Sequence, residues 1–402
     1  MECNNIIPHD WVLKKMPEVV KWGSGGTPRA TESLYYENGT IPWLIIGDLN
    51  DGIVKTSATK ITKLGLENSS AKLIPCGTLL IAMYGSIGKL GITGFECCTN
   101  QAIAFAQRLN GVDTMYLFYY LMMIKPKLVQ MGKGGTQKNI SQTVLNSLYI
   151  PLPPLPTQQA IVARIEALFA ELDKAAEHLR TAQQQLKTYR QAVLKAAFEG
   201  CDSYKKITNC FDVTGGLTKN SQREKFPIKM PYLRVANVYY NRLDLSEIKE
   251  IGVQESEIKD KLLKKDDLLF VEGNGSKEQI GRVAVWNGSI ENCLHQNHII
   301  KSRPLGTMLS KFALYYFISD FGREQILRVA SSTSGLYTLS TEKVRNLNVP
   351  ACPTSDQHRI VQEIESRLLQ AEAAEASIAE ALQKTEALRQ SILKKAFSGE
   401  LV

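Results

Sequence analysis

The sequence lacks the features of several protein classes. None of its apolar runs reaches the ~20 residues that a helix needs to cross a bilayer. The N-terminal MECNNIIPHDW has neither the basic region nor the apolar region of a signal peptide. The eight cysteines include no Cys-x-x-Cys pair and no Cys/His set at zinc spacing. Scattered thiols are typical of a reducing compartment, so we expect a cytoplasmic protein that does not act at a membrane.

Catalytic motifs are also missing. The chain contains no NPP[FY] or DPPY motif for amino methylation and no GxxxxGK[ST] phosphate loop, although Gly85–Lys89 resembles part of one, with Leu90 at the hydroxyl position. Two SEIK tetrapeptides would suit a metal nuclease only with a further carboxylate, so we interpret them as solvated surface. His295 and His298 have no cysteine or carboxylate at ligand spacing. We therefore expect no catalytic residue, no metal ion and no cofactor bound by this chain.

Length and composition indicate two soluble domains with additional structure. A chain of 402 residues exceeds what one core usually holds, and 44% hydrophobic with 22% charged residues is typical of a globular protein. Residues 1–157 carry 14 Lys and Arg against 10 Asp and Glu, and residues 201–356 carry 22 against 18. Segments 158–200 and 357–402 are nearly neutral. Two basic blocks suit a polyanionic partner, although such charge is also common in enzymes.

The chain repeats itself with an offset of 199 residues. QQAIVARIEAL at Gln158 matches QHRIVQEIESR at Gln357, and RQAVLKAAFEG at Arg190 matches RQSILKKAFSG at Arg389. The preceding blocks correspond more loosely, with shared apolar runs and diverged loops. We therefore predict four segments, namely a domain at 1–157, a helix at 158–200, a second domain at 201–356 and a second helix at 357–402.

Each block has the pattern of a mixed, mostly β domain. Apolar runs such as TLLIAMY and DDLLFVE are short and bounded by Gly, Asn and Asp, as strands are. Short helices are expected around YLFYYLMM and ISDFGREQILRVA. The proline-rich segment 151–157 cannot continue a helix or a central strand, so it predicts a boundary. Thr157 and Ser355 are the expected caps of the helices that follow.

The two long helices have a coiled-coil pattern. From 158 to 198 there is no Gly or Pro, and apolar residues recur in steps of four and three. Helices packed on a single core usually run 8–20 residues, which favours the coiled coil. The second helix keeps this register less well, which favours pairing with its unlike sibling. The predicted seam residues are Ile161, Ile165, Leu168, Leu172, Leu179, Leu186, Tyr189, Val193, Ile360, Ile364, Ile378, Leu388 and Ile392.

The order of domain, helix, domain and helix favours an antiparallel pair, because a parallel pair needs a long return linker that the sequence does not provide. The predicted fold class is α+β, with two mixed, mostly β domains, two long helices in an antiparallel coiled coil, and a pseudo-two-fold internal repeat. Two domains held at the ends of such a rod could address DNA half-sites about one helical turn (~34 Å) apart.

The sequence resembles the specificity subunits of type I restriction-modification systems over essentially its whole length. The resemblance rests on GGTP at Gly25–Pro28, IPW at Ile41–Trp43, the junction LYIPLPPLPTQQAIV at Leu148–Val162 and the repeated helix ends. The second block departs from it, because Gly215–Thr218 lacks the proline and Pro231-Tyr232 replaces Pro-Trp. The junction and helix occurring twice is the most specific feature.

The resemblance implies a non-catalytic subunit that reads a bipartite, asymmetric target in double-stranded DNA, one half-site per target-recognition domain. It implies two modification subunits, which use S-adenosylmethionine to methylate adenine N6. It further implies up to two restriction subunits, which use ATP and magnesium to cleave DNA. Two alternatives remain open: the specificity subunit of a related modification system that is not type I, and a coiled-coil scaffold that does not bind DNA.

Loops dense in base-reading side chains are the candidate DNA contacts, because Arg and Lys read guanine, Asn and Gln read adenine, and Thr contacts the thymine methyl. In the first domain they are Thr27, Arg29, Ser86, Lys89, Lys133, Thr136, Gln137, Lys138 and Asn139. In the second domain they are Lys219, Asn220, Gln222, Arg223, Asn274, Ser276, Lys277, Gln279, Arg282 and Tyr337. For each of them the alternative is a solvated loop residue. Asn100, Gln101, Gln296 and Asn297 are omitted, because residues matched between the blocks suit a role in the fold.

Overall fold

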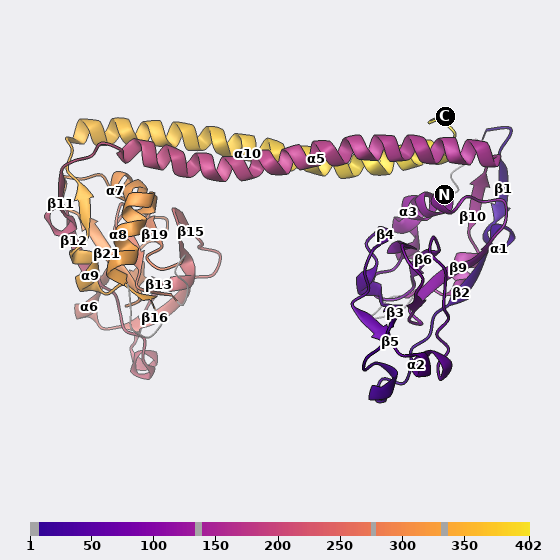
Figure 1. The fold of residues 1–402 in the computed structure, drawn as a ribbon. Helices are drawn as coiled ribbons and strands as arrows, with labels where there is room; N and C mark the ends of the chain where they lie inside the picture. The colour runs from indigo at the N-terminus through magenta and orange to yellow at the C-terminus, as the bar shows by residue number, and fades with distance from the viewer. Residues whose placement is uncertain (1–7, 133–138, 275–278, 331–336) are drawn as a thin grey trace. The chain divides into compact units, whose positions relative to one another are not determined.

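The computed structural model describes residues 8–132, 139–274, 279–330 and 337–402. The chain forms two compact units, Met1–Leu179 with Glu380–Val402, and Arg180–Ala379 (Figure 1). Each unit contains one mixed, mostly β domain and parts of both long helices, which confirms the predicted fold class. The two units are described in turn.

The first domain is built on short strands in three sheets. The strands are β1 Val12–Lys15, β2 Val20–Ser24, β3 Ile41–Leu44, β4 Gly52–Val54, β5 Thr59–Ile61, β6 Leu79–Ala82, β7 Leu90–Thr93, β8 Cys98–Thr99, β9 Ile103–Leu109 and β10 Tyr149–Leu152. The largest sheet has the order β2-β9-β6-β7-β4, the second has β5-β3-β8, and β1 pairs with β10. Strand β6 lies at the centre of the largest sheet and is buried throughout, as its continuous apolar run predicts.

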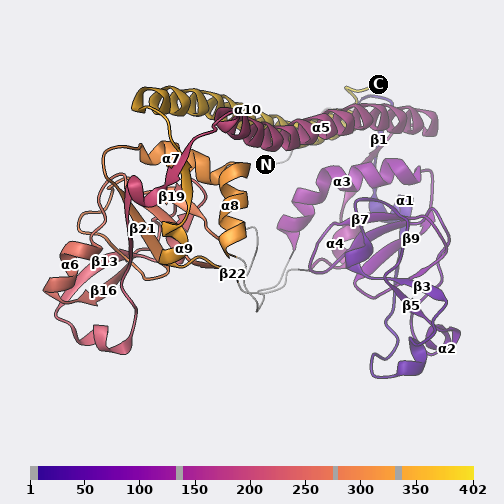
Figure 2. The ribbon, with the colours of Figure 1, turned by 60° about the vertical axis from the view of Figure 1, so that its left-hand side comes forward.

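Helix α3 joins this sheet to the long helices. The helices of the domain are α1 Met16–Val19, α2 Lys63–Glu67, α3 Thr114–Met131 and α4 Gln142–Asn146. Asp113 caps α3, since its carboxylate accepts the amide protons of the first turn at 2.8 and 3.0 Å. Tyr119 of α3 packs edge-on against Phe169 at 5.8 Å, and Tyr116 packs against Phe397 at 4.9 Å. Within this unit α3 therefore lies between the sheet and the long helices (Figure 2).

The second domain repeats the sheet order of the first. Its strands are β11 Tyr204–Lys206, β12 Phe211–Gly215, β13 Ile228–Leu233, β14 Val238–Tyr239, β15 Arg242–Leu243, β16 Lys249–Val253, β17 Leu268–Val271, β18 Gly273–Asn274, β19 Val283–Val285, β20 Leu294–His295, β21 Ile299–Pro304, β22 Tyr337–Thr338 and β23 Asn348–Pro350. The order β12-β21-β17-β19 corresponds to β2-β9-β6-β7, β16-β13-β20 to β5-β3-β8, and β11-β23 to β1-β10. The second domain adds the hairpin β14-β15 and the pair β18-β22. The internal repeat seen in the sequence is therefore a repeat of fold.

Two helices of the second domain replace α3. The helices are α6 Glu255–Lys261, α7 Ser310–Ile318, α8 Asp320–Ala330 and α9 Thr341–Arg345. The chain breaks between α7 and α8 at Ser319, which is fully buried and whose hydroxyl donates to the Tyr316 carbonyl at 2.6 Å. Phe198 packs against Phe312 at 5.3 Å and Tyr316 at 5.4 Å, as Phe397 does against α3 in the first unit. The repeated phenylalanine at each helix end is thus an anchor in the core of a domain.

A buried glutamine joins each domain to its long helix. The amide of Gln158 accepts from the backbone of Asp113 at 2.8 Å and donates to the carbonyls of Gly111 and Pro153 at 3.0 and 2.9 Å. Gln357 accepts from the backbone of Leu309 at 2.8 Å and donates to two backbone carbonyls in the same way. Both side chains are 0% exposed. A fully satisfied amide at the same helical position fixes the same joint in both halves.

The long helices are α5 Leu155–Phe198 and α10 Thr354–Phe397. Both begin before the predicted positions, because Pro156 is compatible with a first turn, where its missing N–H has no partner to lose. Thr157 and Ser355 therefore lie inside the helices, and their prediction as caps is wrong. In the first unit the start of α5 packs with the end of α10, and in the second unit the end of α5 packs with the start of α10. The two helices therefore run antiparallel, as the chain order predicts.

The seam keeps the predicted spacing of three and four residues, but at several places the inward residue is one position later than predicted. In α5 the residues turned inward are Ile165, Phe169, Leu172, Ala176, Leu179, Gln183, Leu186, Arg190, Val193 and Ala197, and in α10 they are Ile364, Leu368, Ala371, Glu375, Ile378, Leu382, Thr385, Arg389, Ile392 and Ala396. Ile161 and Ile360 also lie inward. The prediction is wrong at Tyr189 and Leu388, which are 40% and 51% exposed, because the seam passes one residue later. Leu168 is half-buried beside Phe169, the more deeply buried of the two.

Two polar contacts fit this corrected seam. Arg190 forms an ion pair with Glu375 at 2.8 Å in the second unit, and Arg389 forms one with Asp173 in the first. The guanidinium of Arg389 also lies over the ring of Phe169, 4.7 Å from its centroid. Arg190 and Arg389 thus lie in the seam positions that the apolar pattern assigned to the preceding residues, Tyr189 and Leu388.

Candidate nucleic-acid interface

In the first domain two of the predicted DNA-reading segments lie side by side. Tyr84, which follows β6, forms an isolated antiparallel bridge with Asn139. The Ile140 amide donates to the Met83 carbonyl at 2.9 Å. The loop after β6 and the end of the 133–139 run therefore share one edge. The candidates Lys133, Thr136, Gln137 and Lys138 lie outside the described residues.

A third segment reaches the same edge. The hydroxyl of Thr27 donates to the side-chain oxygen of Gln101, and both residues are exposed. The next residue, Ala102, accepts at its carbonyl from the Met83 amide at 2.8 Å. The segment after β2 and the turn between β8 and β9 thus meet the end of β6. Arg29 is exposed close by in sequence.

The loop from Tyr84 to Lys89 is a tight turn that depends on glycine. Gly85 and Gly88 have φ of 62° and 72°, a conformation that glycine adopts without strain. Ser86 is exposed and accepts at its carbonyl from the Lys89 amide at 3.1 Å. The ammonium of Lys89 donates to the Ile46 carbonyl at 3.4 Å. Ser86 is thus presented to solvent, while Lys89 is half-buried and partly engaged.

The second domain builds the equivalent edge from β18 and β22. Asn274 pairs with Tyr337, and Gly273 pairs with Thr338. Beside them, Nδ1 of His298 lies 2.8 Å from a carboxylate oxygen of Glu272. Among the described residues, the first domain has the Tyr84–Asn139 bridge at the corresponding place. The candidates Ser276 and Lys277 lie outside the described residues.

Two predicted contacts of the second domain belong to its core. Arg223 is 8% exposed and forms an ion pair with Glu257 at 2.9 Å, and its Nε and Nη1 donate to backbone carbonyls at 2.6 and 3.1 Å. Arg282 is 7% exposed, and its Nη2 donates to the Val235 carbonyl at 3.1 Å. We assign both to the fold and correct their prediction as DNA contacts, because a buried guanidinium cannot reach a base edge.

The remaining candidates of the second domain stay exposed. These are Lys219, Asn220, Gln222 and Gln279. The side chain of Asn220 accepts from the Arg223 amide at 3.2 Å and caps the short 3-10 helix Ser221–Lys225. Tyr337 is half-buried at the ribbon. These residues remain predictions as DNA contacts.

Two ionisable side chains are buried in the second domain, one on β20 and one on β21. Burial lowers the pKa of His295 to about 3, so its imidazole is neutral, and Nδ1 bonds to the Ile299 carbonyl at 2.9 Å. Burial also lowers the pKa of Lys301 to about 8, and its ammonium donates to the Asp260 carbonyl at 2.7 Å. In the first domain Thr99 occupies the position of His295, so the matched turn has a different interior in each copy.

Tyr84, Gln101 and His298 were not predicted as parts of these edges. The matched turns at Asn100 and Gln296 were assigned to the fold, and their backbones do serve it, since both amides donate to strand carbonyls at 3.0 and 2.9 Å. The signal for His298 was a position next to matched residues where the two copies differ, whereas Gln101 is itself one of the matched residues that were assigned to the fold.

Neither a metal centre nor a membrane segment emerges from the described part of the chain. Within it, no three His, Cys, Asp or Glu side chains are grouped so that they could hold a metal ion. Within the same residues, no helix combines the length and hydrophobicity that crossing a bilayer requires.

Comparisons with known proteins agree with this architecture. A sequence model of the family "Type I restriction modification DNA specificity domain" matches residues 8–179 and again residues 203–382. The chain is 24% identical to the EcoKI specificity subunit of Escherichia coli K12 over 98% of this chain and 90% of that one. It is 25% identical to the StySPI specificity subunit of Salmonella potsdam, with the same coverage.

Solved structures show the same fold. A chain from a study of complex assembly and conformational transition of the type I R-M system superposes with a TM-score of 0.75 at 18% identity, covering 98% of this chain and 99% of that one. The HsdS subunit of Thermoanaerobacter tengcongensis superposes with a TM-score of 0.61 at 18% identity, covering 98% of each chain. With the family model matched in both halves, the chain belongs to the type I restriction-modification DNA specificity family, and it carries the specificity domain twice.

Proposed function

We propose that this chain is the DNA specificity subunit of a type I restriction-modification complex, and that its two domains read the two unlike halves of an asymmetric target in double-stranded DNA. The observation that carries the proposal is one sheet frame occurring twice with different side chains at the same edge. That edge carries Thr27, Tyr84 and Gln101 in the first domain, and His298 with the β18-β22 ribbon in the second. Like frames position like loops, whereas unlike side chains select different bases.

The antiparallel helices supply the spacing in this proposal. A helix of 44 residues is about 66 Å long at ~1.5 Å per residue, and it resists bending better than a loop would. The length of DNA between the half-sites would then be fixed by the helices and would not depend on its sequence.

Catalysis in this proposal belongs to other subunits. Two modification subunits would bring S-adenosylmethionine for adenine-N6 methylation, and up to two restriction subunits would bring ATP and magnesium for cleavage. The family assignment and the lack of methylation and phosphate-loop motifs in the sequence support this division. Methyl transfer by the purified chain alone would contradict it.

The test is a methylation map. In a host that expresses the chain with its modification subunits, genome-wide mapping of N6-methyladenine should give one bipartite motif with unlike halves and a fixed spacer. Exchanging residues 203–353 for the corresponding domain of a relative should change one half and leave the other half and the spacer intact. A symmetric motif, or a simultaneous change in both halves, would contradict the assignment of one half-site to each domain.

The same experiment separates the alternatives. A scaffold that does not bind DNA would leave the map of the modification subunits unchanged when the chain is deleted. A related system that is not type I would give the map without ATP-dependent cleavage by the assembled complex.

A further inference from the structure

A stack of arginine and tyrosine side chains on the second domain includes Arg282, a residue that the fold removes from the predicted DNA contacts. The hairpin β14-β15 brings Tyr239 opposite Arg242 across a two-residue turn. The guanidinium of Arg242 lies 4.5 Å from the centroid of the Tyr239 ring, and that of Arg282 lies 5.0 Å from it. One tyrosine ring thus holds two positive charges, one exposed and one buried.

One carboxylate, that of Asp244, attracts the Arg242 guanidinium without forming an ion pair with it within the described residues. Other arginines of the unit have carboxylate partners there, as in the pairs Arg190–Glu375 and Arg303–Asp267, whereas Arg242 and Arg282 form no ion pair among those residues. Nε of Arg282 is buried and has no hydrogen-bond partner among the residues that the structure describes. Two like charges on one ring repel each other, so an anion beside them would be stabilised.

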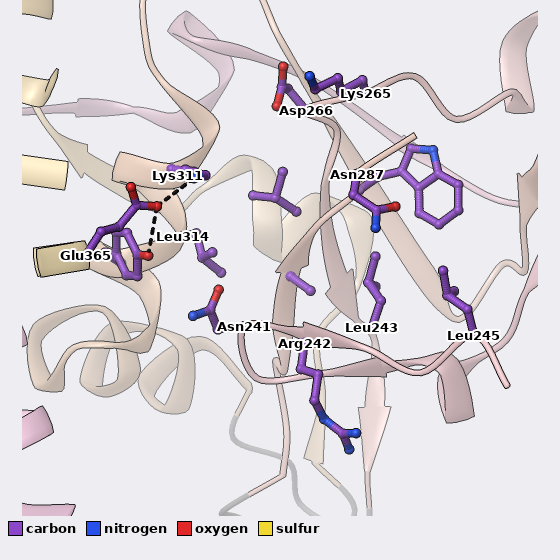
Figure 3. A pocket seen from close by; sticks show the side chains of 14 residues that line it. Asn241, Arg242, Leu243, Leu245, Lys265, Asp266, Asn287, Lys311, Leu314 and Glu365 are labelled. Atoms are coloured by element: carbon purple, nitrogen blue, oxygen red, sulfur yellow. Dashed lines mark hydrogen bonds and ion pairs between the residues drawn. The ribbon is translucent and has the colours of Figure 1, made fainter. Parts of the chain in front are cut away.

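One carboxylate of the adjoining pocket is already engaged. Glu365 accepts from the ammonium of Lys311 at 2.6 Å and from the hydroxyl of Tyr315 at 3.3 Å. Figure 3 shows both contacts, and it shows the guanidinium of Arg242 pointing away from Glu365. The Arg242 guanidinium is therefore held by the Tyr239 ring and points away from the carboxylate of Glu365.

A second, open pocket of about 720 Å³ lies on the side of the hairpin facing α8. Arg190, Arg242 and Arg323 line it, together with Asp320 and Glu372. The guanidinium of Arg323 lies 5.0 Å from the ring of Tyr240, so a second arginine is oriented by the same hairpin. The pocket is wide and open, which suits a groove along an extended ligand better than a closed site for a small molecule.

We propose that Arg242, oriented by Tyr239 and backed by the buried charge of Arg282, binds a phosphate of the DNA backbone. This inference rests on the proposed function and adds a contact that does not depend on sequence. A planar guanidinium matches phosphate oxygens in a bidentate geometry, and contacts to phosphate set the position of a protein on the duplex without reading it. Arg242 is thus a positioning residue for the base-reading edge of its own domain.

The first domain has no such contact at the corresponding turn. Asp51 occupies the position of Asn241, since each amide donates to a strand carbonyl at 2.9 Å and each residue has a left-handed backbone. Asp51 forms an ion pair with Lys125 of α3 at 2.7 Å. The turn of the first domain is therefore neutralised, and the proposed phosphate contact belongs to the second domain alone.

The experiment measures DNA affinity of the full chain assembled with its modification subunits, over a range of salt concentrations. Two duplexes are used, one with the target and one of unrelated sequence. For R242Q we expect the magnitude of the slope of log affinity against log salt to fall by about 0.9. The ratio of unmodified to R242Q affinity should then be about eightfold larger at 0.1 M salt than at 1 M. The loss should be the same for both duplexes.

Matched variants separate charge from orientation. R328Q removes the same charge from α8 of the same domain, where Arg328 is paired with Glu324 at 2.9 Å, and it should leave the slope unchanged. Y239L keeps every charge but removes the ring, and it should reproduce part of the loss. R242K keeps the charge without the planar group and should fall between R242Q and the unmodified chain.

Three outcomes would overturn the inference. They are an unchanged salt slope in R242Q, a loss confined to the target duplex, and binding of inorganic phosphate or ATP by the unmodified complex that R242Q abolishes while its DNA affinity stays the same. Failure of the unmodified complex to bind any duplex would instead contradict the proposed function itself.

Discussion

The two domains solve the same structural problem with different chemistry. In the first domain, the turn at Asp51 contacts α3 through the Asp51–Lys125 ion pair. In the second domain, the corresponding turn contacts α8 through Arg323, whose guanidinium lies over the ring of Tyr240. The backbone is retained, because each turn has a left-handed residue at the same position, Asp51 or Asn241, whose amide donates to a neighbouring strand. The comparison shows that the frame constrains the backbone closely and leaves the charge of the surface free to diverge.

The largest effects should come from the repeated anchors. Phe198 and Phe397 are 1% and 4% exposed, so replacing either with alanine should cost about 3–5 kcal/mol of stability. F198A should destabilise the second unit and F397A the first, as seen by limited proteolysis of each variant followed by mass mapping of the cleavage sites. If protease cleaves the same unit first in both variants, the two units do not unfold independently, contrary to what their separate cores indicate.

The different burial of two leucines near the end of α10 gives the next prediction. Leu393 is 0% exposed and Leu388 is 51% exposed, although both are leucines near the end of α10. L393A should lower the free energy of unfolding by about 2–4 kcal/mol, and L388A should change it by less than about 0.5 kcal/mol. Urea denaturation of the two variants measures the difference. Equal losses would restore the register expected from the sequence.

The buried Arg223–Glu257 pair should contribute less, and with a pH dependence. R223Q leaves the part-exposed Glu257 without its strongest partner, at a cost of about 1–3 kcal/mol. Hydrogen bonding by Arg223 lowers the pKa of Glu257 from 4.5, so its contribution is present above pH 4.5 and is lost as the pH falls through the lowered pKa. The stability difference between R223Q and the unmodified chain should therefore shrink below pH 4.5 in denaturation curves, and a constant difference would contradict this account.

The smallest effect on stability should come from the reading edges. Tyr84 is 44% exposed, and the side chain of His298 is 53% exposed, so Y84A and H298A should each change stability by less than about 0.5 kcal/mol. Their effect should appear in the methylation map, Y84A relaxing one half of the motif and H298A the other. A change in the same half for both variants would contradict the comparison of the two edges.

The frame could be predicted because its signals are local and repeated. The glycine after the first strand of each large sheet is an example. A Cβ at Gly25 would lie 2.2 Å from the Thr99 carbonyl oxygen, and one at Gly216 would lie 2.3 Å from that of His295. That close approach needs glycine in both copies, even where the following proline is missing. The sequence repeat therefore predicts a repeated fold without any knowledge of how the strands pair.

The seam and the buried arginines could be predicted only in part. Alanines and glutamines beside Leu168 and Tyr189 allow a spacing of either three or four residues, and the choice is made by Phe169 and Arg190, which find partners on the other helix. Arg223 follows exposed polar residues in sequence and is buried only because Glu257 lies beside it in space. Contacts between distant segments of this kind leave no period in the sequence.

The glutamine joint has a consequence for how such chains change. Gln158 and Gln357 bind backbone groups alone, so the joint makes no demand on the side chains of the domain that it holds. Any domain with the same turn before its core helix could be received by either helix. A crossover between two genes at this junction would then exchange one whole target-recognition domain. A new specificity could be acquired in one event, without successive substitutions in the DNA-contacting loops.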